Sequence, residues 1–185
     1  MTRRTPHPAN AHVEMVRDDL RSIPRHGLPE GFALRLYRPG DEAAWVAIHQ
    51  DADRLQAVTL DTFRDNFASD LRAMEDRCFF LVAPDGREVG TGTAWYDADY
   101  RGRPYGRVHW ICIAEAYQGR GLAKPLLSTV LLRLARSHDR CCLSTSTARI
   151  AAINLYLKFG FRPAVRCDRD AEIWLRFLDD GGLRI

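Results

Sequence analysis

The most informative segment of this 185-residue chain reads Ala116-Tyr117-Gln118-Gly119-Arg120-Gly121-Leu122-Ala123-Lys124-Pro125-Leu126-Leu127. An apolar, strand-forming segment (108–113) precedes it, and apolar residues follow it at helical spacing as far as Leu134. The sequence therefore predicts a strand that enters a glycine-containing turn and then a helix. Such a turn directs unpaired backbone N–H groups and the positive end of the helix dipole to one point, where a phosphate group binds favourably.

Two glycines allow a ligand to approach this turn closely. Gly119 and Gly121 have no Cβ, so the backbone at these positions is sterically open. The turn is too short for the phosphate loop of nucleoside triphosphatases, and it lacks the glycine spacing of dinucleotide-binding folds. An ordinary strand-to-helix turn is the alternative interpretation.

The turn also matches the pattern Gln/Arg-x-x-Gly-x-Gly/Ala through Gln118, Gly121 and Ala123. It thereby resembles the pyrophosphate-binding loop of the GCN5-related N-acetyltransferases (GNAT), which hold acetyl-coenzyme A (acetyl-CoA). The downstream segment Ala152–Phe161 resembles the closing motif of the same family, a short helix that carries Leu-Tyr and ends in Gly-Phe. Gly160 stands where such a helix needs a left-handed residue to end.

The resemblance implies how acetyl-CoA is held. Backbone N–H groups from Gly119 to Lys124 would bind the pyrophosphate, Gln118 would brace the loop, and the backbone of Ile111 and Ile113 would bond the pantetheine arm. The residues expected to bind acetyl-CoA are Ile111, Cys112, Ile113, Gln118, Gly119, Arg120, Gly121, Leu122, Ala123, Lys124 and Asn154.

The resemblance also places Tyr156 beside the coenzyme A sulfur, as the general acid that protonates the leaving thiolate. A phenol with a pKa of about 10 stays protonated at neutral pH and can supply that proton. A half-buried tyrosine with a satisfied hydroxyl is the structural alternative. Many family members carry an asparagine where this chain has Arg149, which would pair with a phosphate or lie in solvent. Asn154 is then either a pantetheine contact or an exposed helix residue.

The base that takes the proton of the amine is not identified by sequence. Some family members carry a glutamate where this chain has Arg107, and the nearest titratable substitute is His109. Strand alternation would put His109 on the same side as Ile111 and Ile113, so we expect it to be catalytic, with a histidine packed on the sheet as the alternative. Four acids near the expected acceptor side would favour a cationic amine, or are ordinary loop residues: Asp51, Asp53, Asp97 and Asp99.

The element pattern extends the resemblance over about Phe32 to Phe177. It predicts the order β-α-α-β-β-β-α-β-α-β-β, with the last strands near 161–165 and 172–177. The implied fold class is α/β (α+β), an acyl-CoA N-acyltransferase fold with a mixed central sheet of about six to seven strands flanked by about four helices. Residues 31–185 would form this domain. Residues 1–30 would be an N-terminal appendage whose short helix packs on the domain or forms a homodimer contact; its apolar stripe is Val13, Val16, Leu20 and Ile23.

Composition narrows the class of protein. A net charge of +3, without basic blocks, argues against nucleic acid, and no apolar run is long enough for a membrane helix. No secretory signal is evident at the first residues, and the five cysteines are an odd number, so we expect a cytoplasmic, reducing location. The cysteine and histidine spacings do not indicate a metal site.

Together these features predict an acyltransferase of the GNAT type. It would move an acetyl group from acetyl-CoA, as co-substrate, to a primary amine of a small molecule, peptide or protein by direct transfer. The alternative is a non-catalytic acyl-CoA-binding module that senses or regulates.

Overall fold

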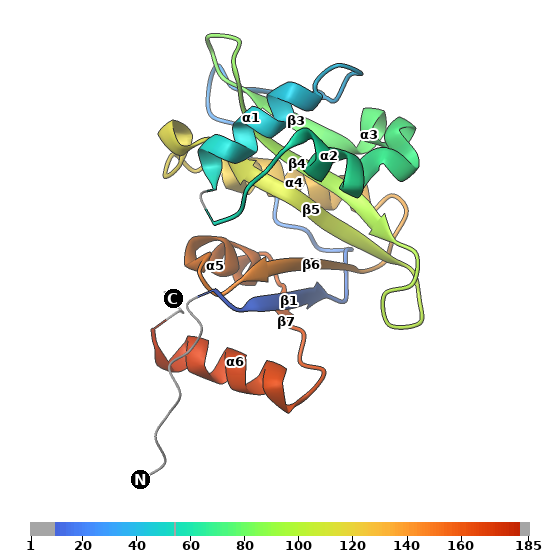
Figure 1. Ribbon diagram of the computed structural model, residues 1–185, viewed down its shortest axis with the longest axis vertical. Helices are drawn as coiled ribbons and strands as arrows, with labels where there is room; N and C mark the ends of the chain where they lie inside the picture. The colour runs from blue at the N-terminus through green and yellow to red at the C-terminus, as the bar shows by residue number, and fades with distance from the viewer. Residues whose placement is uncertain (1–9, 54, 182–185) are drawn as a thin grey trace.

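The computed structural model describes residues 10–53 and 55–181, which form one seven-stranded sheet with helices on both faces (Figure 1). The strand order is β2-β3-β4-β5-β6-β1-β7. The strands are β1 (His12–Arg17), β2 (Ala33–Leu36), β3 (Cys78–Val82), β4 (Glu88–Asp97), β5 (Tyr105–Ile113), β6 (Cys141–Ser146) and β7 (Arg162–Pro163). The helices are α1 (Glu42–Ala52), α2 (Leu60–Phe67), α3 (Leu71–Arg77), α4 (Ala123–Leu134), α5 (Ile150–Lys158) and α6 (Asp168–Asp179).

The sheet is mixed, because β5 and β6 run parallel while the other neighbouring strands are antiparallel. Helices α1 and α2 cover one face of the β3–β5 region and α4 covers the other (Figure 1). The α1–α2 face buries an aromatic core around Trp45, Phe63 and Phe67, and the α4 face buries Leu127 and Leu131. The expected fold class, a mixed sheet flanked by helices, is confirmed.

The N-terminal segment differs from the sequence-based expectation. Residues 12–17 form strand β1, which pairs with β6 along its length and with β7 at Met15 and Val16, so the expected short helix is wrong. Val13, Met15 and Val16 are all buried. A strand buried on both faces loses the apolar–polar alternation that identifies a half-exposed strand, and its apolar residues then resemble a helical stripe. The segment expected to be an appendage thus supplies a strand to the sheet.

The C-terminal segment also differs. Residues 172–177, expected to be a strand, lie within helix α6. Trp174 and Phe177 lie three residues apart on the buried face of this helix, and Asp168 and Asp170 favour its first turn. In this segment the helical spacing of the buried aromatic residues therefore outweighs their intrinsic preference for strands.

Candidate active site

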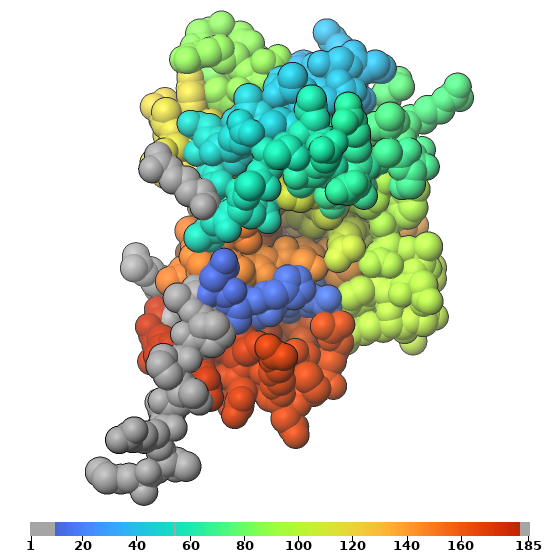
Figure 2. Space-filling model, viewed as in Figure 1, coloured from blue at the N-terminus to red at the C-terminus, as the bar shows by residue number. Residues whose placement is uncertain are grey.

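Strands β5 and β6 separate soon after they begin to pair. Within the described residues their register covers Gly106 with Cys141 and Arg107 with Cys142, so the later backbone groups of β5 on this side have no partner strand. A cavity of about 390 Å³ lies at the separation. Figure 2 shows the surface hollowed between the α1–α2 segment, in cyan and green, and β1, in blue. Residues of β1, β5, β6, α5 and the end of α1 line this cavity.

A β-bulge shapes the β5 wall of the cavity. Three residue steps from His109 to Cys112 lie opposite two steps on β4, and Trp110 has a φ of 46°. The extra residue reverses the alternation of side chains. His109 therefore packs on Phe67 of α2, whereas Ile111 and Ile113 pack on the α4 face. The expectation that His109 shares a side with these isoleucines is wrong for this reason.

His109 is held at the cavity wall by one hydrogen bond and by aromatic packing. Its Nε2 lies 3.1 Å from Oδ1 of Asn66, and its ring centroid lies 5.6 Å from that of Phe67. Burial, with smaller effects of Arg107 and His49, lowers the pKa of His109 to about 3. The imidazole is therefore neutral near pH 7.

A second buried histidine, His49 of α1, lines the same cavity. Its Nε2 lies 2.9 Å from Oγ1 of Thr91 and 3.6 Å from Sγ of Cys112. Burial lowers the pKa of His49 to about 3 and raises the pKa of the Cys112 thiol to about 12. The thiol and the imidazole both stay neutral, so this pair is not arranged as a thiolate nucleophile with its base.

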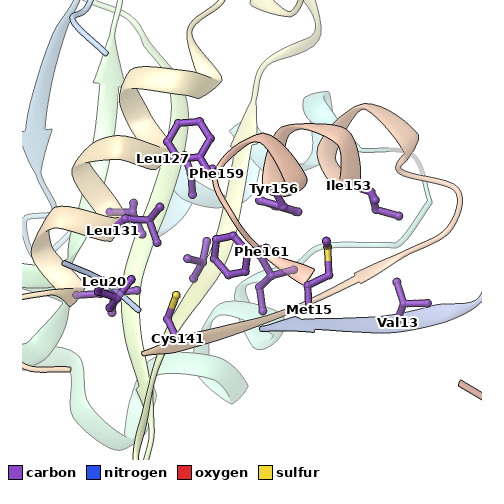
Figure 3. Packing of buried hydrophobic residues seen from close by; sticks show 14 of the residues in the cluster. Val13, Met15, Leu20, Leu127, Leu131, Cys141, Ile153, Tyr156, Phe159 and Phe161 are labelled. Atoms are coloured by element: carbon purple, nitrogen blue, oxygen red, sulfur yellow. The ribbon is translucent and has the colours of Figure 1, made fainter. Parts of the chain in front are cut away.

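Tyr156 faces the cavity from helix α5. The helix ends in a Schellman motif, in which the N–H of Gly160 donates to the carbonyl of Leu157 and the N–H of Phe161 donates to the carbonyl of Tyr156. Gly160 has a φ of 78°, and the ring of Phe161 packs on that of Tyr156 at 5.8 Å. Figure 3 shows these two rings beside Met15 of β1. The helix end thereby fixes the position of the phenol.

The Tyr156 side chain is buried, and burial raises its pKa above the ordinary value. No hydrogen bond joins its hydroxyl to another described residue, so the O–H remains free for a ligand in the cavity. The phenol is consequently a proton donor across the physiological pH range.

The loop after β5 presents open backbone amides. Gly119 and Gly121 have φ values of 73° and 78°, and a Cβ added at either would meet nothing within 4 Å. The backbone N–H groups of residues 119–123 donate to no acceptor among the described residues. The side chain of Gln118 donates to the carbonyls of Ile113 (2.9 Å) and Ala52 (3.3 Å), which ties the loop to β5 and α1. This arrangement suits a phosphate-bearing ligand.

The other side chains of the loop differ in their exposure to solvent. Leu122 is buried just before helix α4, while Arg120 and Lys124 are exposed. The Arg120 guanidinium lies 4.8 Å over the ring of Tyr117. Ala123 begins helix α4, so the positive end of that helix is directed at the loop.

Asn154 and Arg149 are both engaged within the protein. Asn154 donates from its side-chain amide to the carbonyl of Ile150 on its own helix (2.8 Å). Arg149 forms an ion pair with Asp53, with its Nε 3.0 Å from Oδ2, and this pair joins the start of α5 to the end of α1 across the cavity.

The four acids expected near the acceptor do not gather in the cavity. Asp53 lines it, paired with Arg149. Asp51 accepts a hydrogen bond from the N–H of Glu115, Asp97 pairs with Arg107, and Asp99 is exposed in a turn. An acidic subsite for a cationic amine is therefore not formed by these residues.

Of the residues identified from sequence, the structure brings Tyr156, His109, Ile111 and Cys112 to one cavity. Sequence reasoning missed His49, Asn66 and Trp110. His49 lies on a helix expected to form the acceptor wall, but its contact with Cys112 joins residues 63 positions apart and has no local signal. The bulge at Trp110 likewise leaves no sequence signal, because tryptophan does not favour a positive φ.

The described residues contain no group of three His, Cys, Asp or Glu side chains placed to hold a metal ion. Residues 10–53 and 55–181 also include no helix with the length and apolar character needed to cross a membrane.

Comparisons with known proteins agree with this geometry. A family model described as an acetyltransferase (GNAT) domain matches residues 75–163. The mycothiol acetyltransferase of Salinispora arenicola is 34% identical over 155 residues, which cover 75% of this chain and 47% of the relative. The chain thus spans about half the length of such curated relatives.

Solved structures show the same fold. A GCN5-related N-acetyltransferase from Sphaerobacter thermophilus superposes with a TM-score of 0.69 and 23% identity over 84% of this chain and 49% of that one. The ribosomal-protein-S18-alanine N-acetyltransferase of Escherichia coli gives a TM-score of 0.57 and 22% identity over 72% and 79%. The family-model match and the curated relative, together with the amide loop, the separated strands and the Tyr156 helix, show that the chain belongs to the GCN5-related N-acetyltransferase (GNAT) family.

Proposed function

We propose that this protein is an N-acetyltransferase that moves the acetyl group of acetyl-CoA to a primary amine by direct transfer. One observation carries the proposal. The loop of open amides at residues 119–123 follows the strand that lines the cavity, and the free hydroxyl of Tyr156 faces the same cavity. The loop that would bind phosphate and the hydroxyl that would donate the proton therefore lie along one edge of β5, the edge that has no partner strand beyond Arg107 in the described part of the chain.

The loop would hold the pyrophosphate of acetyl-CoA through the amides of residues 119–123, with Arg120 and Lys124 adding positive charge. On its β6 side, where β5 has no partner strand beyond Arg107 within the described residues, backbone groups of Ile111 and Ile113 would bond the pantetheine arm, except for the Ile113 carbonyl, which already accepts from Gln118. A pantetheine contact by Asn154 stays a prediction; its side-chain amide donates to the carbonyl of Ile150 on its own helix. The acetyl group would then lie near the bulge, between Tyr156 and His109.

The proposed reaction is addition of the amine to the thioester carbonyl, followed by loss of the coenzyme A thiolate. The amine nitrogen attacks the thioester carbonyl, a C–N bond forms, and the C–S bond breaks. Tyr156 gives its proton to the sulfur, and the proton released from nitrogen passes to His109 or to water and restores the phenol. Backbone N–H groups at the bulge would stabilise the carbonyl oxygen as it gains negative charge.

Calorimetric titration with acetyl-CoA, desulfo-CoA and ATP tests the binding half of the proposal. We expect micromolar binding of both CoA compounds and none of ATP. Absence of binding by either CoA compound would refute the proposal.

Tyr156→Phe tests the catalytic half, because it keeps the ring that packs on Phe161 and removes the acid. We expect an unchanged Kd for acetyl-CoA and a loss of about 100-fold or more in the rate of thiol release with an amine acceptor. A non-catalytic acyl-CoA sensor would bind acetyl-CoA and release no thiol with any amine.

A cytoplasmic location and a homodimer contact through residues 1–30 stay predictions. Light scattering of the full chain over a range of concentrations tests the second, and a monomer mass throughout would contradict it.

A further inference from the structure

The proton that Tyr156 would give to sulfur leaves a negative charge on a buried phenol. The side chain of Tyr156 is buried, and its hydroxyl receives no hydrogen bond from another described residue. A buried anion without a partner is costly, because it loses its interaction with water. A site that uses this phenol as an acid therefore needs a positive charge close by.

Arg149 supplies a permanent positive charge to the same cavity. The described lining includes no lysine and no second arginine, and its carboxylate is that of Asp53. The other titratable groups that line the cavity beside Tyr156 are His12 from β1, His49 from α1, and His109 and Cys112 from β5. Burial keeps the imidazoles of His49 and His109 and the thiol of Cys112 uncharged near pH 7.

Arg149 and Tyr156 lie on one side of helix α5. Arg149 is the N-cap residue of this helix, and its carbonyl accepts from the N–H of Ile153. The i, i+7 spacing covers almost two full turns, so both side chains point to the same side, and both line the cavity. Helical side chains lean toward the N-terminus of their helix, which directs the phenol toward Arg149. Burial raises the pKa of Tyr156, the charge of Arg149 opposes this effect, and Cys112 adds to it.

Asp53 holds the guanidinium of Arg149 in place. Its Oδ2 accepts from Nε of Arg149 at 3.0 Å and also from Nη2, while Oγ of Ser146 lies 3.4 Å from Nη1. The carboxylate is itself fixed, because its Oδ1 accepts from the N–H of Leu55 at 2.8 Å. The two side chains are 29% and 19% exposed, so water screens their charges only in part.

We propose that Arg149, held by Asp53, stabilises the phenolate that forms when Tyr156 gives its proton to the sulfur of coenzyme A. This inference rests on the proposed function. In that step the O–H bond of Tyr156 and the C–S bond of the thioester break, and an S–H bond forms. The phenolate persists until the proton lost by the amine nitrogen restores the phenol. Arg149 and Asp53 act through Tyr156, so they are positioning residues of the site.

A purely structural role for the ion pair makes a different prediction. Helices α1 and α5 lie on the two sides of the separation between β5 and β6 (Figure 1), and the pair ties one to the other. If this tie were its whole role, removal of either partner would have the same effect. If the charge acts on the phenol, loss of Arg149 leaves an unpaired negative charge near Tyr156, whereas loss of Asp53 leaves an unpaired positive one. The two variants should then change the acidity of the phenol in opposite directions.

Titration of a fluorinated phenol measures that acidity. The full chain is made with 3,5-difluorotyrosine at position 156, because this phenol is more acidic than that of tyrosine and ionises while the protein stays folded. ¹⁹F NMR then follows a single label. A unit charge about 10 Å away, at an effective dielectric constant of about 20, changes a pKa by about one.

We expect the pKa of the labelled phenol to rise by about one in Arg149→Gln and to fall by about one in Asp53→Asn. The double variant has no net charge at the pair, and its phenol should titrate close to the wild type. Arg162→Gln is the matched control, since it breaks an exposed ion pair with Asp18 and should leave the titration unchanged. A change in the same direction in both single variants, or no change in either, would overturn the inference.

The kinetics of thiol release connect this charge to catalysis. Arg149→Gln should lower kcat about threefold to tenfold, and the Kd of desulfo-CoA measured by calorimetry should stay the same. Arg149→Lys keeps a positive charge beside Asp53, so it should retain about half of kcat or more. An unchanged kcat in Arg149→Gln, or a loss that appears only in the Kd, would contradict the inference.

The two experiments separate this inference from the proposed function. If neither CoA compound binds, the proposed function fails, and the ¹⁹F titration still decides whether the charge of Arg149 acts on the phenol. If acetyl-CoA binds, thiol is released and the phenol titrates alike in all variants, the inference fails while the proposed function stands.

Discussion

Gly160→Ala is expected to destabilise the protein more than its position at a helix end alone would suggest. Gly160 has a φ of 78°, and a Cβ placed there would lie 2.8 Å from Nη1 of Arg17. The left-handed backbone costs an alanine roughly 1–2 kcal/mol. Arg17 is 7% exposed and its guanidinium donates to the carbonyls of Asp19 and Ser22, so it cannot move away without weakening these bonds.

Losing one hydrogen bond from a charged group costs about 1.5–3 kcal/mol, so we expect a total loss of about 2.5–5 kcal/mol in the free energy of unfolding. Gly86→Ala is the matched control, since Gly86 has a φ of 84° and open space around its Cβ position. It should cost the backbone contribution of roughly 1–2 kcal/mol alone.

Urea unfolding measures both variants, and a double-mutant cycle with Arg17→Met isolates the contact. In the Arg17→Met background, Gly160→Ala should cost no more than Gly86→Ala does in the wild type. Equal costs for the two glycine variants in the wild type, or the same cost for Gly160→Ala in both backgrounds, would refute the reasoning. Because Phe161 and Gly160 hold Tyr156, the folded Gly160→Ala protein should also release thiol more slowly.

Two further predictions concern pH and the loop. The folded pKa values of His49 and His109, about 3, lie below the ordinary value of 6.5, so the unfolded chain binds protons more readily between these limits. The stability that the two neutral histidines contribute is fully present above about pH 7 and falls on acidification, by about 3 kcal/mol per histidine at pH 4.5. His109→Gln should flatten this dependence in urea unfolding, and an unchanged slope would contradict the assigned burial. Gln118→Ala removes the two hydrogen bonds that tie the loop to Ile113 and Ala52, and it should raise the Kd of acetyl-CoA about tenfold by calorimetry. Gln50→Ala removes a similar bond, to Val58, and should leave that Kd unchanged.

Local signals in the sequence predicted the parts of the fold that depend on neighbouring residues. The strand, loop and helix around Gly121 follow from glycine placement and apolar spacing, and the end of α5 follows from Gly160. Strand β1 could not be recognised in this way, because its partner β6 lies about 130 residues away and burial on both faces erases the alternation.

The same distinction between local and long-range signals applies to the candidate site. Tyr156 and the loop were predictable because each belongs to a short motif. The orientation of His109 depends on one extra residue at the bulge, and its hydrogen bond joins it to Asn66, which belongs to another element and lies 43 positions earlier. Contacts of this kind are set by tertiary packing.

The interior position of β1 has a consequence for biosynthesis. Residues 12–17 leave the ribosome before every other strand of this sheet, yet their partner strand ends at Ser146. At about 5–20 residues per second, this apolar segment waits roughly 6–30 seconds before it can pair. During that interval the half of the sheet that supports α5 is incomplete, and long-range closure makes its formation slow. The nascent chain is therefore vulnerable to aggregation and to chaperone capture at residues 12–17, and CoA-binding competence should be acquired only after β6 and α5 have been made.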